Sequence, residues 1–330
     1  MQSNTFGYIL KVWWPLALSW LFMGLEQPLI SAIIARLPDP TIHLAALGGV
    51  VFPVALIIES PIIMLLTAST ALADHQQAYK RIYSFMMWTS FIITIFHALL
   101  AFTPLYDLLV VATLRPPQEI IEPSRWGLMI LLPWTWSIAH RRFQQGLLIR
   151  FGDSKAISVG TMFRLIASGS SMGLMALLGF PGIIVAATGI SAGVLTEMIF
   201  VAWRAKPIIR DRLPTLNDHT LTWKAFNHFY TPLALTSFLV LVAQPMGSAA
   251  LSRMPEPLNS LAVWPVLVSF IFLFRGLGFA YNEVVVSMLK DKKVSFADLR
   301  QFAWLLSLLL TVFLALIAFT PLANIYFNQV

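Results

Sequence analysis

The sequence contains no cysteine among its 330 residues. This absence excludes disulfide bonds, thiolate metal sites and haem attached through a CxxCH motif. Charge is scarce as well, because Asp, Glu, Lys and Arg make up 11% of the residues while 58% are hydrophobic. A mean hydropathy of +0.77 lies outside the range of soluble globular domains of this length. The composition therefore predicts an all-α polytopic membrane protein.

Motifs for enzymatic chemistry are also absent. The sequence has no GxSxG, no HExxH, no Walker lysine and no glycine-rich phosphate loop. We therefore expect neither an enzyme nor a cofactor. The net charge of +7 comes from basic residues in short segments between apolar runs, a pattern that reports membrane topology and argues against a nucleic-acid partner. We expect membrane lipids and a small-molecule substrate as partners, and the oligomeric state stays open.

The most informative feature is an internal repeat with a constant offset of 217 residues. Residues 15–18 (PLAL) recur at 232–235, and Gln27-Pro28 recurs as Gln244-Pro245. The same offset relates the turn at 36–40 to 253–257 and the FTPL segment at 102–105 to 319–322. In so apolar a chain, this repeat indicates a membrane transporter built from two structural halves.

Apolar runs of about twenty residues predict nine transmembrane helices. We expect a first six-helix lobe at 1–204, a cytoplasmic linker at 205–224 and a partial second lobe of three helices at 225–330. Six helices return the chain to its starting side, so the two lobes are expected as parallel repeats. The second lobe lacks counterparts of helices four to six, and we expect the sequence to be truncated. The nine helices are expected near 8–35, 44–73, 82–112, 126–148, 155–178, 182–204, 225–252, 261–289 and 299–328.

Basic residues are distributed unevenly between the two sides of this topology. With the N-terminus inside, the far side holds only Arg36, Arg115, Arg125 and Arg253. By the positive-inside rule, this bias predicts a cytoplasmic N-terminus, and we expect a bacterial inner (plasma) membrane. The near side holds Lys11, Lys80, Arg81, Arg141, Arg142, Arg150, Lys155, Arg204, Lys206, Arg210, Arg212, Lys224, Lys290, Lys292, Lys293 and Arg300.

Several short segments resemble a known family. They are WWPLAL at 13–18, GLEQ at 24–27, LGFAYNE at 277–283 and AGVLTE at 192–197. Together they are similar to the progressive ankylosis protein family, a branch of the MATE-like multidrug/oligosaccharidyl-lipid/polysaccharide exporter superfamily. The resemblance implies two parallel six-helix lobes around a central cavity lined by helices one, two, seven and eight.

Ionisable residues inside the spans are the candidates for ion coupling, because a charge in hydrocarbon is costly and is usually kept for function or pairing. Glu26 and Glu59 lie in helices that the resemblance turns toward the cavity, where a carboxylate can bind H+ or Na+. Their repeat counterparts are Ala243 and Gly276, so both charges belong to the first half alone. Two alternatives stay open: Glu26 satisfies a kinked backbone, or Arg275 neutralises Glu59.

Substrate contact is predicted for Arg275 and Glu283, which are eight residues apart and therefore on nearly the same helix face. Gln27 and Gln244 are added as repeated polar residues, and Pro28 and Pro245 as hinges, because proline interrupts a helix. Other intramembrane polar residues have expected structural roles. Glu197 either snorkels to the nearby helix end or meets Arg204 there, Arg164 pairs with a carboxylate or a lipid headgroup, and His97 and His140 are interfacial.

These observations predict an ion-coupled secondary transporter, driven by H+ or Na+, that exports a small organic solute by alternating access. The solute is either an organic anion, as the resemblance and Arg275 suggest, or a cationic drug. A flippase for lipid-linked saccharides is one alternative, favoured by Arg275 and Arg164. A non-transporting membrane scaffold or a degenerate fragment is the other.

Overall fold

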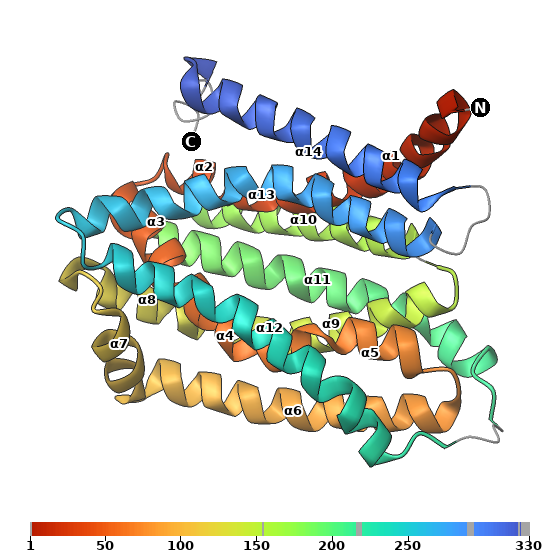
Figure 1. Cartoon of the computed structure of the whole chain (residues 1–330). Coiled ribbons are helices and arrows are strands. Elements are labelled where there is room, and N and C mark those ends of the chain that lie inside the picture. Colours follow the sequence, from red (N-terminus) through yellow and green to blue (C-terminus); the bar gives the residue numbers. More distant parts are fainter. Residues whose placement is uncertain (1, 154, 216–219, 289–293, 323, 325–330) are drawn as a thin grey trace. The chain divides into compact units, whose positions relative to one another are not determined.

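The computed structural model consists of helices joined by short connections (Figure 1). It describes residues 2–153, 155–215, 220–288, 294–322 and 324, and these residues contain no strand. The all-α prediction is confirmed. The helices are α1 (Gln2–Gly24), α2 (Glu26–Ile34), α3 (Pro40–Ala46), η1 (Leu47–Val51), α4 (Phe52–Ile63), α5 (Leu65–Leu72), α6 (Gln76–Phe102), η2 (Asp107–Val111), α7 (Ala112–Leu114), α8 (Gln118–Ile130), α9 (Leu132–Arg150), α10 (Lys155–Leu177), α11 (Gly182–Asp211), α12 (Trp223–Leu251), α13 (Pro257–Met288) and α14 (Phe296–Phe319), where η marks a π-helical segment.

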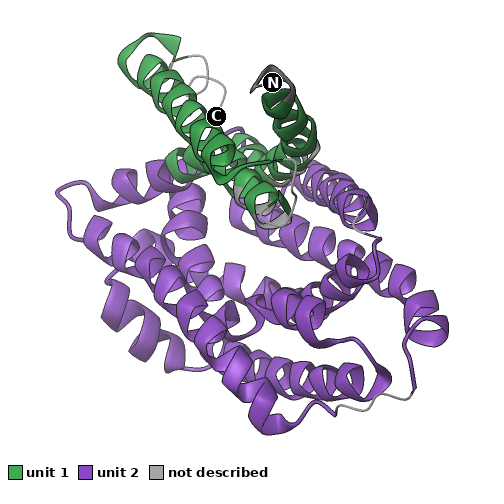
Figure 2. Ribbon diagram, turned by 45° about the vertical axis from the view of Figure 1, so that its right-hand side comes forward, with its two compact units in different colours: residues 1–33, 266–330 green, residues 34–265 purple. Residues whose placement is uncertain are grey.

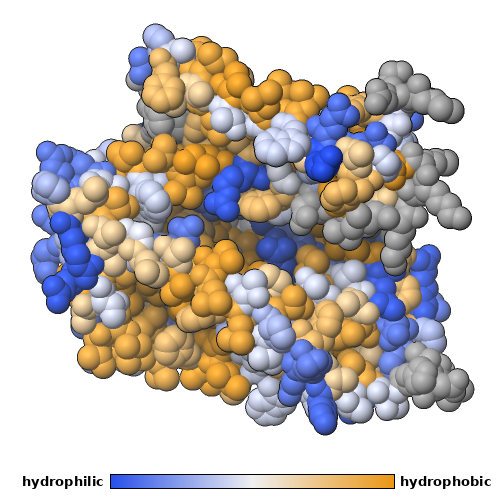
Figure 3. Space-filling model, viewed as in Figure 1, coloured by the Kyte–Doolittle hydropathy of each residue, from blue (hydrophilic) through white to orange (hydrophobic). Residues whose placement is uncertain are grey.

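Seven helical segments of the described residues are long and apolar enough to cross a membrane. Figure 3 shows hydrophobic side chains over much of the face in view. On α14, Trp304 is 73% exposed and Phe319 is 89% exposed, as expected for side chains that face lipid. The predicted segments near 126–148 and 155–178 are helical but outside this set, so nine spans stay a prediction. The seven are Thr5–Ile34, Pro40–Leu72, Gln76–Phe102, Gly182–Asp211, Trp223–Leu251, Pro257–Tyr281 and Phe296–Phe319.

Proline interrupts the first span but not its repeat counterpart. Because Pro28 has no N–H, the carbonyl of Gly24 loses its helical partner, and α1 ends there before α2 begins. In contrast, α12 runs unbroken through Pro245 and α13 runs unbroken through Pro265. The expectation that Pro245 interrupts its helix is wrong, because a long membrane helix can absorb the loss of one hydrogen bond. A hinge at Pro245 without a break in the helix stays a prediction.

Helix ends repeat with the sequence. α6 ends at Phe102 and α14 at Phe319, the two positions that the 217-residue offset relates. The following residues, Thr103 and Thr320, are both extended because each precedes a proline. Each threonine hydroxyl also donates to the carbonyl four residues earlier, at 2.6 Å in both cases. The third span is therefore shorter than the predicted 82–112. The arrangement of the two lobes as parallel repeats stays a prediction.

Two compact units emerge from the internal packing (Figure 2). Unit 1 comprises residues 1–33 and 266–330, and unit 2 comprises residues 34–265. These units differ from the expected lobes at 1–204 and 225–330, whose boundaries follow the sequence repeat. The lobes stay a prediction.

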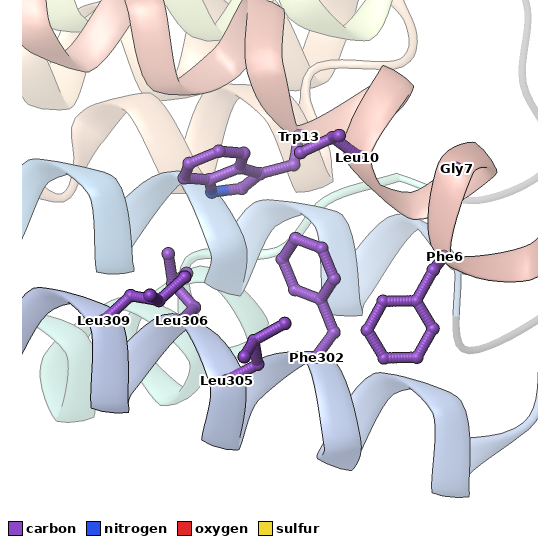
Figure 4. Close-up of a pocket in the computed structure, with 8 residues that line it drawn as sticks. All are labelled: Phe6, Gly7, Leu10, Trp13, Phe302, Leu305, Leu306 and Leu309. Carbon is purple, nitrogen blue, oxygen red and sulfur yellow. The ribbon is translucent and has the colours of Figure 1, made fainter. Parts of the chain in front are cut away.

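The core of unit 1 joins α1 to α13 and α14. Trp13 donates from Nε1 to the carbonyl of Leu277 at 3.1 Å, and the Tyr281 hydroxyl donates to the carbonyl of Leu299. Tyr281 stacks on Phe302 with ring centroids 5.3 Å apart. Beside this core, α1 and α14 border an apolar cavity of about 270 Å³ (Figure 4). Its lining carries no charged side chain, so it is not a candidate site for ion coupling.

Unit 2 is held together by close helix packing around α9. α10 packs against α11, α11 against α9, and α9 against α5 (Figure 1). The closest approach lies at Gly146, where a Cβ would fall 2.3 Å from the carbonyl oxygen of Leu66. The Thr70 hydroxyl donates to the Gly146 carbonyl at 3.1 Å across the same contact. This packing places the polar residues of α9 inside unit 2.

Candidate functional site

Glu197 is the centre of a buried polar cluster in unit 2. It lies on α11, and its side chain has no exposed surface. Arg141 donates to its Oε2 at 2.6 Å, and Gln145 donates to its Oε1 at 2.9 Å. Thr161 and Arg164 of α10 approach the same carboxylate at 3.4 Å and 3.5 Å. Four donors from two neighbouring helices therefore stabilise the ionised form of Glu197.

Arg141 and Arg142 were expected on the cytoplasmic side. The structure shows that α9 continues to Arg150 and that Arg141 is only 4% exposed, and the membrane side of both residues stays a prediction. One expectation for Glu197 is wrong. Glu197 was expected to meet Arg204, but Arg204 instead pairs with Asp153 at 2.7 Å. The reason is the length of α11, because its continuation to Asp211 places Glu197 nearly four turns from the helix end.

Arg164 meets one of its two expected roles. The alternatives were a carboxylate partner or a lipid headgroup, and the structure places its guanidinium beside Glu197. α10 carries both Arg164 and Thr161 on the face that packs against α11. Gly160 and Gly193 allow this close approach, because a Cβ at Gly193 would lie 3.0 Å from the Arg164 backbone oxygen.

Glu59 is the second buried carboxylate of unit 2 and is only 1% exposed. It lies on α4, where the positive charges of Arg141 and Arg142 act on it. Unlike Glu197, Glu59 is not fully hydrogen-bonded, since its Oε1 has no hydrogen-bond partner among the described residues. A buried carboxylate oxygen without a donor is costly. Glu59 and Glu197 therefore differ in how completely their carboxylates are hydrogen-bonded.

Arg142 carries a positive charge that acts on Glu59. The negative charges of Glu59 and Glu197 and the positive charges of Arg141 and Arg164 all act on its guanidinium. Its Nε has no hydrogen-bond partner within the described ranges. With three arginines and two glutamates, the cluster carries one positive charge in excess when every group is ionised. If Glu59 were protonated, that excess would be two positive charges.

The other expected ion-coupling residue lies in unit 1. Glu26 is the first residue of α2 and is 7% exposed, so it is buried as predicted for an intramembrane carboxylate. Gln27 and Pro28 follow it, and both are half-buried. Because Pro28 interrupts the helix here, a role for Glu26 at the kinked backbone and a role in ion coupling both stay predictions.

The expected substrate residues are not gathered into one described group. Arg275 of α13 is exposed and lies over the ring of Phe279, 5.6 Å from its centroid. Glu283 also lies on α13, but its side chain is outside the described part of the chain. Gln244 is half-buried on α12 in unit 2. Substrate contact by these residues, and the pairing of Arg275 with Glu59, stay predictions.

His97 and His140 were expected at the membrane interface, and this depth stays a prediction. His97 has no exposed surface, and its Nδ1 is 2.7 Å from the hydroxyl of Thr135. His140 is half-buried against the ring of Tyr83, with centroids 6.1 Å apart. Both residues pack against the helices around α9. Within the described ranges, no three His, Asp or Glu side chains come together as metal ligands would.

Sequence analysis missed the polar face of α9. Residues 140–145 (HRRFQQ) fall in the second half of the predicted helix near 126–148, and Arg141 and Arg142 were interpreted only as topology signals. The missed signal is the spacing of Arg141 and Gln145, which are four residues apart and share a helix face. Both side chains bind the same carboxylate, so this face is directed into the bundle.

Comparison with known proteins identifies the fold. No protein-family model and no curated protein matches the sequence. Among solved structures, the chain is similar to a multidrug resistance MATE family transporter of the MOP superfamily in an inward-facing conformation. The match has a TM-score of 0.67 at 17% identity and covers 91% of this chain and 70% of the other. The chain is thus an all-α integral membrane protein with a MATE-like fold.

Proposed function

We propose that this protein is an ion-coupled secondary transporter in which Glu59 binds and releases the coupling ion, H+ or Na+. The MATE-like fold supports this class, because the solved structure that it resembles is described as a multidrug resistance transporter. Transport would proceed by alternating access, with a small organic solute exported against its gradient. Glu26 is proposed as the second ion-coupling group.

The observation that carries the proposal is the contrast between two buried carboxylates in unit 2. Glu197 accepts hydrogen bonds from four neighbours, whereas Glu59 keeps an oxygen without a donor among the described residues. A fully hydrogen-bonded carboxylate holds its charge, and an incompletely bonded one gains most from a proton or a cation. Glu197 therefore serves the structure, and Glu59 serves the coupling.

The sign of coupling depends on the charge of the solute. A cationic solute would compete with the ion for the Glu59 carboxylate, so that ion entry drives solute exit. An anionic solute would instead be favoured by protonated Glu59, because the arginine cluster then has a larger positive excess, and it would move in the same direction as the ion, so that its export needs an outward ion gradient. Arg275 and Glu283 are proposed to contact the solute together with Gln27 and Gln244, while Pro28 and Pro245 act as hinges.

The flippase alternative rests on cationic residues free to bind a lipid-linked saccharide. Arg164 was one of these, and its guanidinium lies beside Glu197. No contact among the described residues favours a flippase over a solute transporter. A non-transporting scaffold is an outcome that the following experiment would detect.

Flux measurements in proteoliposomes test the proposal. A pH or Na+ gradient is imposed, and movement of ethidium as cationic probe and fluorescein as anionic probe is followed by fluorescence. We expect gradient-driven movement of one probe by the wild type and its loss in Glu59→Gln. Glu119→Gln is the matched control, because Glu119 is an exposed glutamate at the start of α8. Wild-type flux in Glu59→Gln would remove Glu59 from the mechanism, and movement of neither probe under any gradient would favour the scaffold.

A further inference from the structure

A polar pocket lies at one end of unit 2, away from the buried polar cluster around Glu197. It has a volume of about 320 Å³ and is formed by the connection between α9 and α10 and by the last turns of α11. The guanidinium groups of Arg204 and Arg212 line this pocket beside apolar side chains and backbone groups. The lining residues are Phe151, Gly152, Asp153, Arg204, Pro207, Ile208 and Arg212.

The local sequence fixes the shape of this pocket. α9 ends in a Schellman motif, in which the Asp153 N–H donates to Leu148 at 2.8 Å and the Gly152 N–H donates to Ile149 at 3.1 Å. The motif requires a left-handed residue, and Gly152 supplies it with φ of 82°. The chain therefore turns sharply, and Asp153 is directed to α11, where it meets Arg204.

Both arginines keep donors for a ligand. Arg204 uses Nε for Asp153 at 2.7 Å, and Arg212 uses Nη1 for the carbonyl of Phe151 at 3.4 Å. Their remaining guanidinium nitrogens make no hydrogen bond within the described residues. Arg204, Arg212 and Asp153 together leave one positive charge in excess. Planar guanidinium groups with free donors match the oxygens of a phosphate group.

The pocket lies where a membrane surface is expected. Trp203 precedes Arg204 on α11 and is 61% exposed, and Ile199 one turn earlier is 62% exposed. Tryptophan is enriched at the level of lipid headgroups, and exposed isoleucine suits acyl chains. Hydrogen bonds from Arg150 to Thr70 and from the Gln76 N–H to Pro214 place the ends of α5, α6 and α9 at the same end of unit 2. This end carries many of the basic residues.

We propose that this pocket binds the phosphate group of an anionic phospholipid, with Arg204 and Arg212 as its ligands. Basic pockets between helices at the cytoplasmic side of a membrane are suited to acidic headgroups. Asp153 opposes the anion and thereby limits its affinity. The proposal is independent of ion coupling at Glu59, because none of the pocket residues belongs to the cluster around Glu197.

Native mass spectrometry of the delipidated full chain in detergent tests the proposal. The protein is titrated with phosphatidylglycerol, which is anionic, and with phosphatidylcholine, which carries no net charge. We expect tighter binding of phosphatidylglycerol, and a loss of about fivefold in its affinity for each of Arg204→Gln and Arg212→Gln. Asp153→Asn should bind phosphatidylglycerol more tightly, and a merely destabilised protein would not show this gain.

Arg210→Gln is the matched control, because Arg210 is on the same helix but pairs with the exposed Asp211 and does not line the pocket. It should leave phosphatidylglycerol binding unchanged. Soluble glycerol 3-phosphate is the last ligand to be titrated, and it should bind far more weakly than phosphatidylglycerol. Three outcomes would each overturn the proposal. The two lipids could bind equally, Arg210→Gln could lose as much affinity as Arg204→Gln, or glycerol 3-phosphate could bind as tightly as the lipid.

Discussion

The hydroxyl of Tyr230 donates a 2.5 Å hydrogen bond to the carbonyl oxygen of Pro61, joining α12 to α4. This bond lies two residues from Glu59 on the same helix. Tyr230 is 4% exposed and is fixed by Phe226, which stacks on it at 5.3 Å, and by Phe85, whose ring meets it edge-on at 5.0 Å. The first helix after the linker is thus connected to the turn of α4 that follows Glu59.

Replacing Tyr230 by phenylalanine tests this connection. Tyr230→Phe keeps the ring packing but removes the donor to Pro61, so we expect a loss of about 1 kcal/mol in stability. Thermal unfolding in detergent measures the effect. Tyr83→Phe is the control, because Tyr83 packs beside Phe143 but its hydroxyl makes no hydrogen bond in the described part of the chain. Equal melting temperatures for Tyr230→Phe and wild type would mean that the bond contributes nothing.

Replacing Gly146 tests the close helix packing that places the polar face of α9 inside unit 2. In Gly146→Ala the new methyl group would lie 1.8 Å from the Ser69 hydroxyl and 2.3 Å from the Leu66 carbonyl oxygen. The helices must separate, at a cost of about 1–3 kcal/mol. Gly169→Ala on α10 is the control, since nothing lies within 4 Å of its Cβ. Unfolding in a denaturing detergent should rank Gly146→Ala below wild type and Gly169→Ala at or above it.

Glu197 is predicted to be essential for stability. Glu197→Gln leaves Arg141 and Arg164 without their counter-ion in a buried site, and breaking such a pair costs about 3–5 kcal/mol. We expect poor folding yield and a much lower melting temperature. Asp211→Asn removes an exposed carboxylate that pairs with Arg210 and should leave both quantities unchanged. A Glu197→Gln variant as stable as wild type would contradict the structural role of this residue.

The sequence predicted the helical segments better than their ends, although local rules explain several of the ends that the predicted ranges missed. The ends of α6 and α14 follow from the Thr-Pro pairs at 103–104 and 320–321, because the residue before proline disfavours helix. The start of α3 at Pro40 and of α13 at Pro257 follows from the repeated turn in the same way. Apolar run length locates these helical segments but not their ends, since α6 ends at Phe102 and α14 at Phe319 where the predicted ranges were 82–112 and 299–328.

The candidate site was only partly predictable, because it depends on tertiary packing. The intramembrane position of Glu59 identified it from sequence alone, as charges in hydrocarbon are rare. The partners of Glu197 are 33 to 56 residues away in the chain, on α9 and α10. Spacing shows that Arg141 and Gln145 share a face, but only the packing of α9 against α11 shows which neighbour that face meets.

The central claim is that Glu59, and not Glu197, exchanges the coupling ion. Infrared difference spectroscopy of the protein in lipid measures this without a known solute, because the C=O stretch of a carboxyl group reports protonation and cation binding. Spectra are recorded on lowering the pH and on adding Na+. We predict a wild-type carboxyl signal with a component that is missing in Glu59→Gln and kept in Glu119→Gln, while the signal of Glu26 remains in both variants. An unchanged signal in Glu59→Gln would contradict the account.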